Sequence, residues 1–138
     1  MNLLSILLLS LVSLLQSNNQ VDLIFVGDAM QHQPQITAAL QAGGNQSYDY
    51  SACFKYVEDD IKSADYGLVN LECTLGGTPY KGYPCFSAPE AYARQLKNVG
   101  FDLFFTANNH CLDRRDAGLC RTIDQLDAMG IPHIGTYK

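Results

Sequence analysis

The chain has 138 residues, of which 47% are hydrophobic, and it carries a formal net charge of −5. This length predicts one domain rather than two, and the apolar fraction is high enough for a packed core, so intrinsic disorder is not expected. No block of Lys or Arg is present to neutralise phosphates, which excludes a nucleic-acid partner.

Residues 1–20 form a leader that differs from the rest of the chain. From Leu3 to Leu15 every residue is apolar except three serines, and no charge is present. This stretch is shorter than the roughly 20 residues of a membrane-spanning helix, which predicts a signal peptide. No Lys or Arg precedes it and Leu15-Gln16-Ser17 is a poor cleavage site, so an uncleaved membrane tether is the alternative. Both readings predict an exported protein that is periplasmic, in the cell envelope or membrane-associated, with its domain at residues 21–138.

The first half of the domain predicts one strand followed by two helices. Residues 23–26 are apolar and end at Gly27-Asp28, which is typical of a buried strand. Pro34 suits the first turn of a helix that Gly43 ends, and a second helix is expected from Phe54 to Ile61.

The second half predicts alternating strands and helices. Apolar runs indicate strands around Leu68-Val69, at 103–105 and at 131–134. Helices are expected from about Pro89 to Gly100 and from just after Asp113 to Gly130. This order predicts an α/β fold with a mostly parallel sheet and helices on both faces.

The segment 74–88 interrupts this alternation, because it is rich in Gly, Pro and Tyr. Such composition excludes a helix and predicts an ordered excursion or a small hairpin. It leaves the sheet directly after Glu72, so it forms either a wall over a functional site or an ordinary surface loop. In the first case Tyr80, Lys81 and Tyr83 are the expected substrate contacts.

Three of the predicted strands end at residues that can bind a metal. Asp28 follows the first, Glu72 the second, and the tripeptide Asn108-Asn109-His110 the third. Because the carboxyl ends of parallel strands meet at one edge of a sheet, these groups are expected to converge. His32, four residues after Asp28, either joins the same metal or caps a helix. Structural alternatives remain open, since Gly-Asp and Asn-Asn also occur in plain turns.

Several other polar residues have simpler explanations. Asp113 and Asp116 are expected to serve the N-terminus of the last helix, where negative charge is favourable. His133 is expected to be a packed or surface histidine. The cysteine count is odd, so at least one has no partner within the chain, and none forms a Cys-x-x-Cys pair. The cysteines are Cys53, Cys73, Cys85, Cys111 and Cys120.

A series of short motifs in this chain resembles the bacterial CapA family, the capsule-synthesis proteins linked to poly-γ-glutamate. The motifs are Gly27-Asp28, His32-Gln33-Pro34-Gln35, Tyr48-Asp49-Tyr50, Ala64-Asp65, Asn70-Leu71-Glu72, Phe86-Ser87-Ala88-Pro89, Gly100-Phe101-Asp102, Ala107-Asn108-Asn109-His110, Asp113, Thr122, Leu126 and Gly130-Ile131. The resemblance runs from Val21 to the end. It implies the N-terminal half of a calcineurin-like metallophosphatase fold, an αββα sandwich.

The resemblance also implies roles for individual residues around two divalent metal ions. Asp28 would bind the first metal, Glu72 would bridge, and Asn109 would bind the second. His110 would polarise the substrate or protonate its leaving group. His32 would be a further ligand, although the family of phosphatases usually has Asp-x-His rather than the spacing found here. Asn108, with Tyr80 and Lys81, is the expected set of substrate contacts.

The function implied is a capsule biosynthesis protein with a metal-dependent hydrolase site, acting on a small phosphoryl or acyl substrate. The alternative is a non-catalytic component that binds or exports an anionic polymer such as polyglutamate, together with other capsule-synthesis membrane proteins. Proteins of the family are normally about twice this length and bring further ligands from later strands. We therefore also expect that the 138 residues alone are an inactive fragment.

Overall fold

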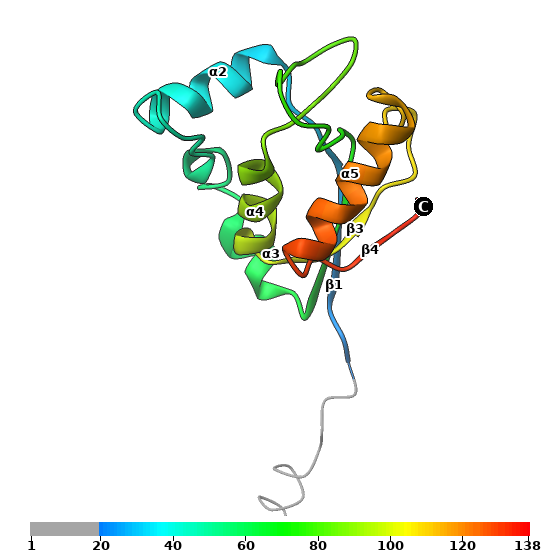
Figure 1. Ribbon diagram of the computed structural model, residues 1–138. Coiled ribbons are helices and arrows are strands. Elements are labelled where there is room, and N and C mark those ends of the chain that lie inside the picture. Colours follow the sequence, from blue (N-terminus) through cyan, green and yellow to red (C-terminus); the bar gives the residue numbers. More distant parts are fainter. Residues whose placement is uncertain (1–19) are drawn as a thin grey trace, which may run out of the picture.

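Four parallel strands form a single sheet in the order β1-β2-β3-β4. The computed structural model describes residues 20–138 and is shown in Figure 1. The elements, in chain order, are β1 (Leu23–Ala29), α2 (Gln33–Ala42), the 3-10 turn η1 (Ser51–Cys53), α3 (Glu58–Ser63), β2 (Tyr66–Leu71), α4 (Glu90–Val99), β3 (Phe101–Phe105), α5 (Arg115–Ala128) and β4 (His133–Ile134). The parallel α/β class predicted from the sequence is confirmed.

Helix ends follow the local signals in the sequence. Pro34 lies in the first turn of α2, and Gly43 is its C-cap. Gly100 ends α4 with φ of 120°, a conformation that costs Gly little, and the Ile61 and Lys62 side chains approach it closely. The helix expected from Phe54 is shorter than predicted. It begins only at Glu58, where three consecutive acidic residues meet the positive end of the helix dipole.

One hydrophobic core joins the helices to one face of the sheet. Val69 pairs with Val26 and with Phe104, so these three side chains point to the same face. Val69 and Phe104 are buried in the core together with residues from every helix. Burying a single aliphatic side chain of this size contributes about 1.5–3 kcal/mol, so this face dominates the stability. The helix residues in the core include Ala39 of α2, Ile61 of α3, Leu96 of α4 and Leu126 of α5.

The opposite face of the sheet differs from the expectation of helices on both faces. Its outermost residues, Leu23, Phe25 and Ile134, are 53%, 64% and 44% exposed. Each strand pairs with the next strand in sequence. Because right-handed crossovers join these neighbours in the same direction, every connecting helix lies on the same side of the sheet. Within residues 20–138 this second face therefore has no helical cover, and a second sheet of a sandwich stays a prediction.

The excursion 74–88 is ordered by hydrogen bonds at its base. The Ala88 N–H donates to Thr74 O at 2.8 Å, and the backbones of Lys81 and Ser87 exchange two hydrogen bonds of 3.0 and 2.8 Å. The Thr74 hydroxyl donates to Phe86 O at 2.6 Å. As its composition predicts, the segment contains no helix and folds back on itself.

Two sequence expectations concern the leader and the cysteines. Residues 1–19, which carry the expected signal peptide or tether, lie outside the described part of the chain. Within residues 20–138 no helix has the length and apolar character needed to cross a membrane. The five cysteines are all free thiols.

Candidate metal and catalytic site

Asp28 and Glu72 come together through the side chain of Asn70. Asp28 and Asn70 are neighbours in the register of β1 and β2, beside an irregularity that falls between Val26 and Asp28. The Asn70 amide Nδ2 donates to Asp28 Oδ1 at 2.8 Å and to Glu72 Oε2 at 3.1 Å. The carboxyl ends of two adjacent strands thus bring together two carboxyl groups that are 44 positions apart in sequence.

The two carboxyl groups have opposite pKa shifts. The hydrogen bond from Asn70, followed by one from Glu72, lowers the pKa of Asp28. Partial burial raises the pKa of Glu72, and the hydrogen bond and charge of Asp28 raise it further, while the charge of His110 lowers it. Glu72 therefore keeps its proton to higher pH than Asp28. A bound cation would offset the repulsion between the two carboxylates once both are ionised.

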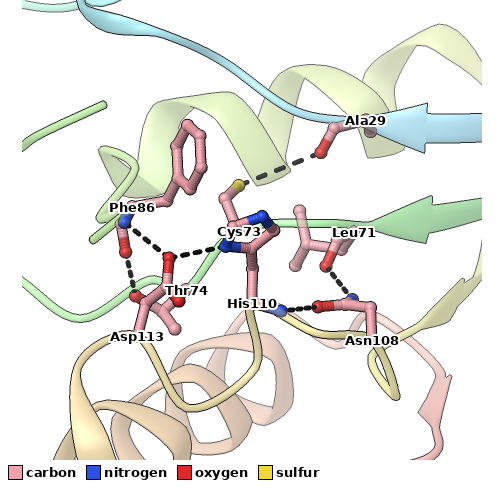
Figure 2. A network of polar contacts seen from close by, with 8 residues as sticks. All are labelled: Ala29, Leu71, Cys73, Thr74, Phe86, Asn108, His110 and Asp113. Carbon is pink, nitrogen blue, oxygen red and sulfur yellow. Dashed lines mark hydrogen bonds and ion pairs between the residues drawn. The ribbon is translucent and has the colours of Figure 1, made fainter. Parts of the chain in front are cut away.

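Asn108 attaches the turn after β3 to the end of β2. Its Nδ2 donates to Leu71 O at 2.9 Å and to Asn70 Oδ1 at 3.1 Å, and its Oδ1 accepts the His110 N–H at 3.0 Å. Figure 2 shows Asn108 between Leu71 and His110. Asn109, the residue expected to bind metal, is exposed and forms no side-chain hydrogen bond within the described residues. Of these two amides, it is Asn108 that lies beside the carboxyl pair.

His110 is oriented by Asp113. The His110 Nδ1 lies 2.9 Å from Asp113 Oδ2, and the same oxygen accepts the Phe86 N–H at 2.7 Å, as Figure 2 shows. Both side chains are largely buried, with 16% and 12% exposed. Because a carboxylate only accepts, Nδ1 donates, and Nε2 is left as the nitrogen available for proton transfer.

Asp113 was expected to serve the helix N-terminus, and its contacts show a different use. Its carboxylate accepts from Phe86 and His110, whereas α5 starts with Arg114 as its N-cap. Sequence reasoning missed this residue and Asn70 as members of the site. The spacing His110-x-x-Asp113 was the available signal, since side chains three residues apart in a helical turn meet.

Phe86 separates His110 from His32. Its ring, only 1% exposed, meets the His110 ring edge-on at 4.7 Å and the His32 ring edge-on at 5.0 Å between centroids. His32 also starts α2, with its N–H donating to Gln35 Oε1 at 2.9 Å. The described contacts therefore place His32 against Phe86 and at a helix start, and none of them joins its imidazole to Asp28 or Glu72.

Of the three substrate contacts expected in segment 74–88, Tyr80 is half-buried, whereas Lys81 and Tyr83 are exposed. Tyr80 is half-buried, and its hydroxyl donates to Glu90 Oε2 at 2.8 Å. Burial and the neighbouring Glu90 raise the pKa of Tyr80 to about 12. Lys81 is exposed and pairs with Ser87 through its backbone. Tyr83 is 72% exposed, with its ring 6.4 Å from that of Phe86.

The donor set of the site is rich in oxygen. Asp28 and Glu72 supply carboxylates, and Asn70 and Asn108 supply amides within hydrogen-bonding distance of one another. Among residues 20–138 no group of three or more His, Cys, Asp or Glu gathers in a metal-binding arrangement. The two carboxylates suit a hard divalent cation such as Mg²⁺, Mn²⁺ or Ca²⁺ rather than a zinc site. The amide oxygens are already engaged, because Asn70 Oδ1 accepts from Asn108 Nδ2 and Asn108 Oδ1 accepts from the His110 N–H. The two-metal arrangement stays a prediction.

The fold and this site define a class: a parallel α/β domain whose strand ends carry a carboxyl pair beside an oriented histidine. The family model described as "Bacterial capsule synthesis protein PGA_cap" matches residues 22–138. The chain therefore belongs to the bacterial capsule synthesis protein family, and the resemblance to CapA proteins noted from its motifs is confirmed.

A relative in Sinorhizobium fredii (strain NBRC 101917 / NGR234) gives a second comparison. This protein, named "Uncharacterized protein y4uA", is 30% identical over 131 residues. The match covers 86% of this chain and 26% of the relative, so the chain spans about a quarter of the length of that protein.

Proposed function

We propose that this chain carries the core of a metal-dependent hydrolase site that acts on a phosphoryl or acyl bond during capsule synthesis. The observation that carries this proposal is the pairing of a carboxyl cluster with an oriented histidine. Asn70 joins Asp28 to Glu72, and Asp113 fixes the ring of His110 nearby. A site that only binds a polymer has no need for a histidine whose free nitrogen is defined by a buried carboxylate.

Each residue then has a distinct task. Asp28 and Glu72 would hold a divalent cation in place of the Asn70 Nδ2 that donates to both carboxylates. Such a cation, when bound, activates water and neutralises charge that develops on the reacting oxygens. His110 keeps a proton at Nε2 for the leaving-group oxygen, and Asp113 stabilises the imidazolium form. A second cation with Asn109 as a ligand, and His32 as a further ligand of the cation at Asp28, remain part of the proposal because the family resemblance implies them.

The family supports a role in the cell envelope, with poly-γ-glutamate or its precursors as candidate substrates. Because the chain spans 26% of its relative, the activity of the whole protein is proposed for the longer polypeptide rather than for these residues alone. Export, through a leader at residues 1–20, and contact with other capsule-synthesis membrane proteins are part of the same proposal.

The cationic side chains around the excursion favour a hydrolase over a polyanion binder. Arg114 donates through its guanidinium to Pro79 O at 3.1 Å, and Arg121 pairs with Glu90 at 2.6 Å. These two guanidinium groups are therefore engaged within the protein. Lys81 and Arg115 are exposed, which is a small supply of charge for a groove that would grip an anionic polymer.

The test is turnover of two substrates, bis-p-nitrophenyl phosphate and poly-γ-glutamate, by the full-length polypeptide with Mn²⁺ or Mg²⁺ present. We expect turnover that a chelator abolishes and that His110→Ala reduces by about 10²–10⁴-fold. His133→Ala is the matched control, because His133 hydrogen-bonds to the Ile131 backbone O at 3.0 Å and lies within 4.0 Å of Asp127. Retention of the polymer without turnover would replace the hydrolase by a binding component.

A further inference from the structure

Gly82 lies where the excursion 74–88 meets the start of α2. The residue is buried, and its backbone N–H donates to Gln33 Oε1 at 3.3 Å. A Cβ added at Gly82 would lie 2.5 Å from the Gln33 backbone N, and 3.0 and 3.1 Å from the His32 backbone C and Cα. Gly82 does not have a positive φ. The position therefore needs the absence of a side chain rather than a torsion that only Gly tolerates.

A small hairpin connects Gly82 to Phe86. The backbones of Lys81 and Ser87 form an antiparallel bridge with hydrogen bonds of 3.0 and 2.8 Å. Gly82 and Phe86 are the next residues inside this bridge, and only residues 83–85 join them. Because the hairpin is so short, a displacement of Gly82 is transmitted to Phe86.

The base of the excursion is held by α4 and by the start of α5. The Tyr80 hydroxyl donates to Glu90 Oε2 at 2.8 Å, and the Arg114 guanidinium donates to Pro79 O at 3.1 Å. The excursion therefore cannot move away from α2 as a whole without losing these contacts. A clash at Gly82 must be relieved within the hairpin or at the start of α2.

Phe86 connects this hairpin to both histidines near the carboxyl pair. Its ring meets the His32 ring at 5.0 Å and the His110 ring at 4.7 Å, edge-on in both cases. Its N–H donates to Asp113 Oδ2, the same oxygen that lies 2.9 Å from His110 Nδ1, as Figure 2 shows. The position of Phe86 thus determines the surroundings of both imidazoles.

We propose that Gly82 is a positioning residue for His32 and His110. Because it has no side chain, the hairpin sits directly on the start of α2. This contact places the Phe86 ring against both imidazoles and brings the Phe86 N–H to Asp113. The placement of the imidazoles rests on the contacts described above, whereas its consequence for catalysis rests on the proposed function.

The first measurement compares the histidine ring NMR signals of the metal-free full-length polypeptide with those of Gly82→Ala. The added Cβ would fall about 1 Å short of an ordinary van der Waals contact with the α2 backbone, so the hairpin must move. Because an aromatic ring shifts the signals of nearby protons, we expect the ring signals of His32 and His110 to change. Those of His133, which bonds to the Ile131 backbone O at 3.0 Å, are the internal control and should not change.

The second measurement is turnover of bis-p-nitrophenyl phosphate by the same polypeptide with Mg²⁺. We expect Gly82→Ala to lower kcat by about 10²-fold with little change in KM, because a displacement of about 1 Å can cost that much. A purely structural role would instead lower the unfolding temperature and leave the kcat of the folded protein unchanged.

Gln33→Ala gives the same test without adding atoms, and it decides the question if Gly82→Ala does not fold. It removes the acceptor of the Gly82 N–H from an exposed position. We expect smaller changes of the His32 and His110 signals and a fall in kcat of at most about tenfold. Gln41→Ala is the matched control, because Gln41 is exposed near the other end of α2, and it should leave both measurements unchanged.

Three results would overturn the proposal. They are unchanged His32 and His110 signals in Gly82→Ala, changed signals with a wild-type kcat, and equal effects of Gln33→Ala and Gln41→Ala on the signals and kcat. A different result would reject the hydrolase while supporting the positioning of the imidazoles. In that case the wild-type polypeptide would show no metal-dependent turnover, although its histidine signals respond to Gly82→Ala as expected.

Discussion

His110 and Asp113 are joined by a hydrogen bond of 2.9 Å between Nδ1 and Oδ2. The same carboxylate oxygen accepts the backbone N–H of Phe86 at 2.7 Å, so the excursion 74–88 and the turn after β3 meet at one acceptor. This contact fixes both the orientation of the imidazole and the nitrogen that faces away from Asp113. The excursion thereby takes part in positioning the histidine.

Replacing Asp113 by Asn tests this positioning role. An amide at this position can donate to Nδ1 and stabilise the wrong tautomer, so we expect kcat to fall by about 10²-fold or more while KM changes little. Asp116→Asn is the control, because Asp116 is exposed in the first turn of α5. Equal kcat values for both variants would reject the assignment.

The neighbouring amides Asn108 and Asn109 provide a second test. Asn108 takes part in three hydrogen bonds around the site, whereas Asn109 is exposed without one in the described structure. Asn108→Ala should lower the free energy of unfolding by about 1–3 kcal/mol, because it leaves partly buried groups unpaired. Asn109→Ala should change it by less than about 0.5 kcal/mol. Urea denaturation measures both, and a larger loss for Asn109→Ala would contradict the geometry.

The raised pKa of Glu72 predicts a pH-dependent gain in stability for Glu72→Gln in the absence of metal. The unfolded chain releases this proton near the ordinary pKa of 4.5, while the folded chain retains it to higher pH. Between these values the native state binds more protons, so ionisation of Glu72 destabilises the fold as the pH rises. Gln removes that cost.

We therefore expect thermal unfolding of Glu72→Gln at a higher temperature than the wild type at pH 7, and no such gain well below pH 4.5. Asp59→Asn, an exposed acid of α3, is the control. A Glu72→Gln variant that is less stable than the wild type at pH 7 without metal would contradict this prediction. It would show that the ionised Glu72 carboxylate stabilises the metal-free protein.

Leu126 tests the single core on the helical side of the sheet. It is fully buried on α5 in the cluster that includes Val69 and Phe104. Leu126→Ala should cost about 2–5 kcal/mol through lost burial and the cavity left behind. Leu112, which is 53% exposed, is the control, and Leu112→Ala should cost less than about 0.5 kcal/mol. Similar losses in chemical denaturation would contradict the core described for α5.

Much of the fold is readable from local signals. Gly43 and Gly100 end their helices at the predicted positions. Helix termination by Gly depends on the local backbone conformation, so it can be predicted from a short stretch of sequence. The convergence of Asp28 and Glu72 also follows from the sequence once the sheet is taken as parallel. The order of the strands in the sheet could not be predicted from the sequence, because it depends on pairing between distant segments. The position of all the helices on one face of the sheet follows from that order.

Details of the site needed the structure for a different reason. Asn108 and Asn109 follow a strand in a turn, where the alternation of side chains no longer holds, so the sequence does not show which amide points inward. Asp113 precedes a helix, and its contact with the Phe86 N–H arises from a segment 27 residues away. Phe86 itself looks like any buried aromatic residue until its neighbours His32 and His110 are seen.

Binding of Mn²⁺ to the metal-free full-length polypeptide, followed by electron paramagnetic resonance at pH 7, tests most directly whether Asp28 and Glu72 form a cation site. We expect stoichiometric binding by the wild type and by the control Asp59→Asn, and its loss in Asp28→Ala and in Glu72→Ala. Affinity should rise with pH as Glu72, whose pKa is raised, releases its proton. Stoichiometric Mn²⁺ retained by both alanine variants would contradict the account.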